Sequence, residues 1–154
     1  MRTYFHALKY DIMTAMTVNE RLGGYGVLKH KIRNNFDLAF LAENGVPKAA
    51  IQHLADSAGL DVKELISLLP VTPRNLLRYE DTDLLSNVVS DHLISLADVI
   101  SVGTRVLGRE YFLEWLHSNI LALGNEKPIQ YLRTHAGIEV VKTELGRIEH
   151  GIFA

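Results

Sequence analysis

Histidine, serine and threonine are the side chains in this sequence that could support catalysis or metal binding. None of the seven histidines stands four residues from another beside a glutamate, which is the spacing that holds zinc on a helix. His117 precedes Ser118 and His135 follows Thr134, but neither pair lies in the Gly-x-Ser-x-Gly turn of a serine nucleophile. The absence of cysteine excludes thiol catalysis, disulfides and thiolate-bound zinc. We therefore expect no enzyme activity, no metal and no cofactor.

Other polar side chains are suited to reading DNA. A helix predicted over residues 62–69 is followed by a second one over residues 74–79, and this pair has the form of a helix-turn-helix. Arginine recognises guanine and asparagine recognises adenine through paired hydrogen bonds, and two arginines four residues apart share a helix face. An acidic turn follows, so a solvated face of a helical bundle is an equally good interpretation. The predicted DNA-binding residues are Thr72, Arg74, Asn75 and Arg78.

The last four residues, Gly151-Ile152-Phe153-Ala154, are unusually apolar for the end of a chain. The glycine is expected to end the preceding helix, and two large apolar side chains follow it. Such side chains are costly to leave in water. Two interpretations remain open: the tail folds back onto its own core, or Ile152 and Phe153 insert into a pocket of a partner protein.

Helices are predicted to position all of these residues. From residue 34 onward, apolar residues recur at helical spacing, and glycines and prolines separate one segment from the next. The longest predicted helix runs over residues 89–107, and a last helix follows Gly137. The single tryptophan, Trp115, is predicted to anchor the core. No useful alternation of apolar and polar residues occurs, so the predicted class is all-α.

Residues 1–33 differ from the rest of the chain in charge and pattern. They hold six basic and two acidic residues, whereas the whole chain has a net charge of −2. Their helical periodicity is poor, and the stretch Gly23-Gly24-Tyr25-Gly26 interrupts any helix. No Gly-Lys-Ser/Thr follows these glycines, so they indicate a flexible turn and not a phosphate-binding loop. We expect a basic extension with only a local attraction for phosphate.

Composition bounds the size and location of the protein. The 154 residues suffice for one domain or two small ones, and a hydrophobic fraction of 47% is enough for a core. No apolar run approaches the roughly 18 residues of a membrane helix, and residues 1–10 lack the apolar stretch of a signal peptide. We expect a cytoplasmic protein without a membrane segment.

Several short strings in the second half of the chain are specific in composition and order. They are Trp115-Leu116, Ala122-Leu123-Gly124, Pro128, Leu132, Thr134, Gly137 and, above all, Leu145-Gly146-Arg147-Ile148-Glu149-His150-Gly151-Ile152. Together they resemble the toxin-binding domain of the Xre/MbcA/ParS antitoxin family. Upstream, Pro73-Arg74-Asn75-Leu76-Leu77-Arg78 and Ser90-Asp91-His92-Leu93 resemble the Xre-type helix-turn-helix of the same family. The resemblance extends over residues 36–154.

This resemblance implies an antitoxin encoded beside a RES-domain toxin, an NAD-degrading enzyme whose active site the antitoxin would occlude. Operator DNA is the second implied partner, bound by homodimers that carry two DNA-binding units. The expected toxin contacts are Arg147, His150, Gly151, Ile152, Phe153 and Ala154. The alternative is a stand-alone helix-turn-helix transcription regulator that needs no toxin.

The expected organisation has three parts. Residues 1–33 form the basic extension, and residues 34–107 form an Xre-like helix-turn-helix bundle with its long connecting helix. Residues 108–154 form a small helical toxin-binding domain. The sequence departs from the family at Asn119-Ile120 and Lys127, in a loop near the toxin contacts, and at Tyr79 and His92, which replace basic residues. Fewer cations predict DNA binding that is weaker and less sensitive to salt.

Overall fold

The computed structural model describes residues 2–151, apart from the side chains of residues 2, 5, 6, 8, 10 and 11. This part of the chain is all-helical, as predicted, and contains no strand. The elements are α1 (Arg2–Arg21), α2 (Gly24–Leu28), α3 (Asn35–Asn44), α4 (Ala49–Ala58), α5 (Val62–Ser67), α6 (Pro73–Leu76), α7 (Asn87–Leu107), α8 (Arg109–Leu116), the 3₁₀ helix η1 (Leu121–Leu123), α9 (Pro128–Tyr131) and α10 (His135–Glu149).

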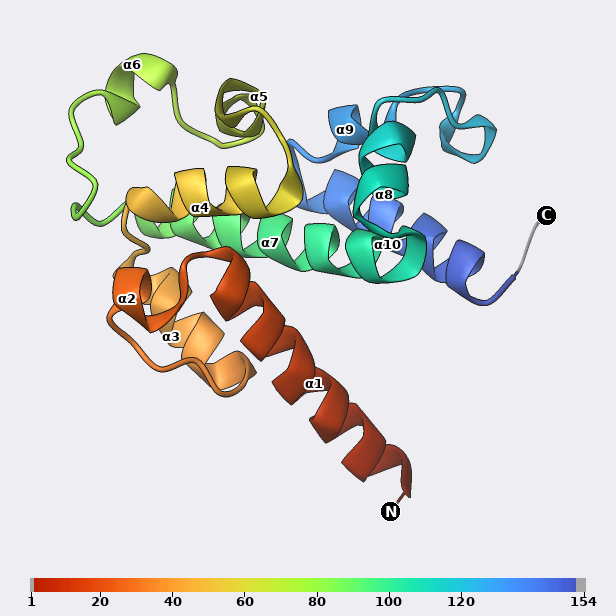
Figure 1. The fold of residues 1–154 in the computed structure, drawn as a ribbon, viewed down its shortest axis with the longest axis horizontal. Helices are drawn as coiled ribbons and strands as arrows, with labels where there is room; N and C mark the ends of the chain where they lie inside the picture. The colour runs from red at the N-terminus through yellow and green to blue at the C-terminus, as the bar shows by residue number, and fades with distance from the viewer. Residues whose placement is uncertain (1, 152–154) are drawn as a thin grey trace.

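Helix α7 lies at the centre of the fold (Figure 1). Helices α10, α3 and α1 all pack against it, and α8 folds back from its C-terminal end. Leu93, Leu96 and Ile100 are fully buried, because α7 is covered on more than one face. Ser86 caps its first turn by accepting a hydrogen bond from the amide of Val89. The predicted long helix is confirmed, and it connects the α3–α6 region to the α8–α10 region.

Helix α1 contradicts the prediction that residues 1–33 have little helical order. Ala15, Val18 and Leu22 are fully buried where the C-terminal half of the helix packs against α7 and α4. The N-terminal half projects away from the other helices (Figure 1). The pattern was missed because the buried stripe is short and polar residues separate its members.

The junction between α1 and α2 contains the glycine turn and one basic residue, Arg21, that contacts another helix. Gly23 and Gly24 have φ of +103° and +67°, which glycine adopts without steric cost, so the chain turns between α1 and α2 as predicted. Gly24, Tyr25 and Gly26 nevertheless lie in α2, so the prediction that the whole stretch interrupts helical structure is wrong. Arg21 is half-buried, and its Nε donates a hydrogen bond to Ser101 Oγ of α7 at 2.7 Å. This cation therefore joins two helices instead of attracting phosphate.

The C-terminal region is built from α8, η1, α9 and α10. Trp115 is buried in the core as predicted, and Phe112 packs against Gly103 of α7, where an added Cβ would stand 2.1 Å from the Phe112 ring. Helix α10 begins earlier than expected, at His135, because Thr134 Oγ1 accepts a hydrogen bond from the amide of Gly137 at 3.0 Å.

All of these helices share one core. Buried side chains from α1 to α10 form a single cluster, so the division into three parts stays a prediction. Over residues 2–151, every helix is either too short or too polar to cross a membrane.

Candidate functional site

The first candidate surface surrounds α6. Thr72 Oγ1 accepts a hydrogen bond from the amide of Asn75 at 3.2 Å, so Thr72 caps the helix. Arg74, Asn75 and Arg78 are exposed, which leaves three polar side chains open to solvent on one short segment. The predicted helix is too long, however. It ends at Leu76, and Arg78 lies in the following turn instead of on the helical face of Arg74.

The surroundings of α6 are more acidic than basic. Between residues 61 and 83 the cations are Lys63, Arg74 and Arg78, whereas the carboxylates are Asp61, Glu64, Glu80, Asp81 and Asp83. Asp83 is engaged within its own loop, because its Oδ2 accepts a hydrogen bond from the amide of Glu80 at 2.8 Å. A phosphate backbone that approaches α6 meets few favourable charges. Lys63, Arg74 and Arg78 are the exposed cations that this segment presents to solvent.

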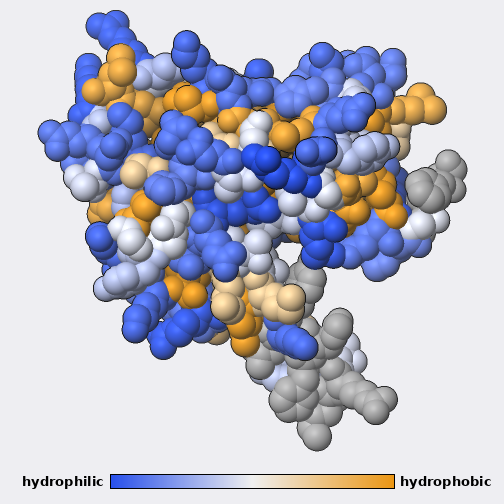
Figure 2. Space-filling view, in the orientation of Figure 1, coloured by the Kyte–Doolittle hydropathy of each residue, from blue (hydrophilic) through white to orange (hydrophobic). Residues whose placement is uncertain are grey.

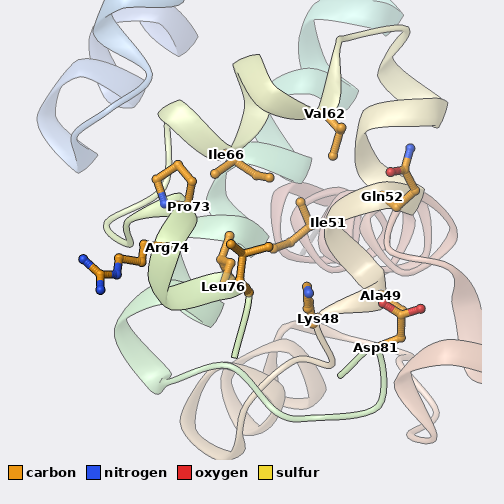
Figure 3. Close-up of a pocket in the computed structure, with 11 residues that line it drawn as sticks. Lys48, Ala49, Ile51, Gln52, Val62, Ile66, Pro73, Arg74, Leu76 and Asp81 are labelled. Atoms are coloured by element: carbon orange, nitrogen blue, oxygen red, sulfur yellow. The ribbon is translucent and has the colours of Figure 1, made fainter. Parts of the chain in front are cut away.

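A cleft of about 410 Å³ lies beneath α6, between α4, α5 and α6 (Figure 3). Its apolar lining includes Ile51 of α4, Ile66 of α5 and Leu76 of α6. Lys48 stands at its edge and donates a hydrogen bond from Nζ to Tyr79 O at 2.8 Å. In Figure 3, Arg74 points away from the cleft. The apolar side of α6 thus faces the protein, and its arginine faces outward.

The second candidate surface is the end of α10. Arg147 is exposed, with Nη1 3.7 Å from Glu144 Oε2, and His150 is exposed at the C-cap. Gly151 has φ of +68°, a left-handed conformation that ends the helix, as predicted. The other predicted contacts, Ile152, Phe153 and Ala154, lie outside the described residues.

An ion pair holds the C-terminal end of α10 against α7. Arg105 of α7 forms two hydrogen bonds with the carboxylate of Glu149. These hydrogen bonds lower the pKa of the Glu149 carboxyl below its ordinary value, so the pair stays charged at neutral pH. The last turn of α10 is thereby attached to the central helix while Arg147 and His150 face solvent.

The sequence reasoning missed two exposed apolar residues of the C-terminal region. Leu121 of η1 is 86% exposed and Val140 of α10 is 43% exposed. A shallow groove between η1 and α10 runs from Leu123 past Val140 to Arg147. Figure 2 shows hydrophobic colour at the loop that carries η1, at the upper right of the view. The unusual Asn119-Ile120 pair was a signal that this loop differs, but the sequence did not indicate which side chain it exposes.

Two histidines make contacts between regions of the fold, whereas His135, which was considered with Thr134 for catalysis, is exposed at the start of α10. His117 Nε2 lies 2.6 Å from Glu64 Oε1, and His92 Nε2 lies 2.9 Å from Leu132 O. Each contact joins the α3–α7 region to the C-terminal region. Among the side chains that the structure describes, no three metal-ligating groups lie close enough together to hold an ion.

Comparison with known proteins assigns two regions of the chain. Residues 37–98 match the Antitoxin Xre-like helix-turn-helix domain, and residues 103–151 match the Antitoxin Xre/MbcA/ParS C-terminal toxin-binding domain. A search of curated proteins found no match. Among solved structures, the fold is similar to a chain in the crystal structure of the M. tuberculosis MbcT–MbcA toxin–antitoxin complex. The TM-score is 0.55 with 22% sequence identity, and the match covers 68% of this chain and 94% of that chain.

The two matches follow the order that the sequence resemblance predicted. The first contains α6 with Arg74 and the following turn with Arg78, and the second contains η1, α10 and the helix end with Arg147 and His150. Helices α1 and α2 lie outside both. The chain belongs to the Xre/MbcA/ParS antitoxin family.

Proposed function

We propose that this protein is an antitoxin that binds and inactivates a RES-type, NAD-degrading toxin through the end of α10 and the tail beyond it. The main support for the proposal is the arrangement of residues at the C-terminal end of α10. The Arg105–Glu149 pair fixes it, Arg147 and His150 face solvent, and Gly151 directs the chain out of the helix. The matched toxin-binding domain includes these residues, and the sequence resemblance supports the RES type of the toxin.

The physical argument concerns the chemistry of the surface. Apolar side chains at the end of a chain gain free energy when a partner removes them from water, and they commonly dominate an interface. Charged neighbours contribute more to register and association rate than to affinity. We therefore assign anchoring to Ile152 and Phe153 and orientation to Arg147 and His150, with Leu121 and Val140 extending the contact.

The test is co-expression with the toxin encoded by the adjacent reading frame. We expect this protein to co-purify with the toxin and to restore growth and cellular NAD. A chain truncated after His150 should keep its helix content and thermal stability but lose the protection. Arg147→Ala should weaken the complex, whereas Arg133→Ala, at an exposed arginine before α10, should not. Full protection by the truncated chain would refute the tail contact.

We propose DNA binding through α5 and α6 as a second activity, by which the antitoxin regulates its own operon. Exposed Arg74, Asn75 and Arg78 support it, as does the matched helix-turn-helix domain. In this proposal two copies act together, because a helix-turn-helix dimer reads two half-sites about one helical turn of DNA apart. DNA binding without any toxin partner would instead favour the stand-alone regulator.

A further inference from the structure

Helix α3 has an apolar face that is largely exposed, although Phe40 stacks on His30 with the ring centroids 4.7 Å apart. Phe36, Ala39 and Phe40 stand three and four residues apart on this face, and Phe36 is 86% and Phe40 52% exposed. Val88, at the start of α7, is 62% exposed and lines the same surface hollow as Ala39. The opposite side of α3 buries Leu41 and packs against α7. Exposed aromatic residues in such a group are typical of a protein interface.

Charge is distributed unequally along this face. Lys29, Lys31 and Arg33 are exposed in the loop that leads into the N-terminal end of α3. Arg33 is paired with Asp37 of the first turn at 3.6 Å, so Lys29 and Lys31 supply the positive charge of this end. At the C-terminal end, Glu43 and Asp91 are exposed and line the same hollow. The face therefore has a basic end, an apolar middle and an acidic end. We call the surface formed by Phe36, Ala39, Phe40, Glu43 and Val88 the α3 face.

The α3 face is complementary to itself. When two copies meet about a twofold axis with their α3 helices antiparallel, each apolar middle covers the other and each basic end meets an acidic end. The helix dipoles are then also antiparallel, which is favourable. We infer that two copies of this chain pair through the α3 face. This inference rests on the two-copy assembly proposed above and assigns its surface.

The position of α3 is compatible with both proposed activities. In Figure 1, α6 and the end of α10 lie away from α3, at the top left and the right of the molecule. Pairing through α3 therefore covers neither Arg74 and Arg78 nor the helix end at His150. Because α3 has ten residues and a length of about 15 Å, the contact is small and the dimer is expected to dissociate on dilution.

Sedimentation of the full chain over a range of concentrations tests this surface. We expect a reversible dimer, and we expect Phe36→Glu to give a monomer with unchanged helix content, since Phe36 contributes little to the fold of one copy. Tyr111→Glu is the matched control, because Tyr111 of α8 is a 60% exposed aromatic residue away from α3. The control variant should remain dimeric.

Cross-linking tests the α3 face independently, because the chain contains no cysteine. Ala39→Cys, at the middle of the α3 face, should form a disulfide-linked dimer on mild oxidation, and Glu139→Cys on exposed α10 should not. If the Phe36→Glu variant is still a dimer, or if Glu139→Cys cross-links and Ala39→Cys does not, the α3 face is not the dimer interface. The proposal that two copies assemble would then remain. A wild-type chain that is monomeric at every concentration would overturn both, and neither result bears on the toxin contact.

Discussion

His117 has a hydrogen-bond acceptor at each ring nitrogen. Nδ1 lies 2.8 Å from Leu113 O, and Nε2 lies 2.6 Å from Glu64 Oε1. Both contacts are hydrogen bonds only when the ring carries two protons. The Leu113 carbonyl and then Glu64 raise the pKa of His117, against the opposing effects of burial and Lys127. The protonated ring therefore connects α8 of the toxin-binding domain to α5 of the helix-turn-helix.

This contact predicts a pH-dependent contribution to stability. Because the pKa of His117 is higher in the folded chain, the contribution is complete below the unfolded value of about 6.5 and disappears as pH rises through the folded value. The difference in melting temperature between wild type and His117→Gln should be largest in mild acid and should close in alkali. The difference in melting temperature should be small, since the His117 side chain is 42% exposed. A difference that does not change with pH would contradict this assignment.

Gly103 and Gly146 make a matched pair of helical glycines. An added Cβ at Gly103 would overlap the Phe112 ring, whereas nothing lies within 4 Å of one at Gly146. We expect Gly103→Ala to destabilise the fold by about 1–3 kcal/mol through overpacking. Gly146→Ala should stabilise it by about 0.5–1 kcal/mol, because alanine favours the helix. Urea unfolding midpoints measure both, and equal midpoints would show that Phe112 is not held against α7.

At the scale of elements, the sequence predicted those helices whose apolar stripe and caps are both complete. Helices α4 and α7 were predicted in this way. The predicted C-terminal end of α6 lies three residues beyond the observed one, Leu76. A four-residue helix has no complete apolar stripe, so the sequence pattern does not define where it ends. Helix α1 was missed because few of its described side chains are buried. Ala15, Val18 and the adjacent Leu22 are covered by helices that are distant in sequence.

The candidate sites were predictable to a similar extent. Thr72 and the arginines near it follow from local capping signals, which a sequence contains. The exposure of Leu121 and Val140 depends on how η1 packs beside α10, and local sequence does not encode this. The same is true of the α3 face, where the helical spacing of Phe36 and Phe40 does not reveal which side of the helix α7 covers.

Removal of α1 tests its role in the core. A chain that begins at residue 23 lacks three buried side chains and uncovers their partners on α7 and α4. We expect a loss of at least about 2–5 kcal/mol in the free energy of unfolding, or an unfolded chain. A chain that begins at residue 13 should lose much less, since none of the described side chains before that position is buried. Circular dichroism during thermal unfolding distinguishes the two, and equal stability would contradict the packing of α1.

The charges around α6 predict how this element binds DNA. With few cations to release counterions, affinity for the DNA upstream of its own reading frame should be modest and should fall only gently with salt. Arg74→Ala and Arg78→Ala should each lower the affinity and reduce the salt slope by about one. Arg133→Ala is the control at an exposed arginine of the other domain. Fluorescence anisotropy at several salt concentrations measures both quantities, and unchanged binding in both variants would place the DNA surface elsewhere.

At the scale of the whole molecule, α7 separates the two candidate surfaces. Helix α6 and the end of α10 lie at opposite ends of the view in Figure 1. One helix contributes to both regions: its first half packs beside α3, and Arg105 in its last turn holds Glu149. The two surfaces are thus distant from each other. The end of α10 packs directly on α7, whereas α6 packs over α4 and α5, and α4 in turn contacts α7.

This arrangement predicts that toxin and DNA bind at the same time and that each activity can be removed alone. Truncation after His150 should abolish protection from the toxin and leave DNA affinity unchanged, because α6 is remote from the tail. Arg74→Ala combined with Arg78→Ala should abolish DNA binding and leave protection intact. A native gel of wild-type antitoxin, toxin and labelled DNA should contain one ternary complex. The truncated chain should bind only DNA, and the double arginine variant should bind only the toxin. Competition between toxin and DNA would instead mean that the surfaces overlap or that α7 transmits a change between them.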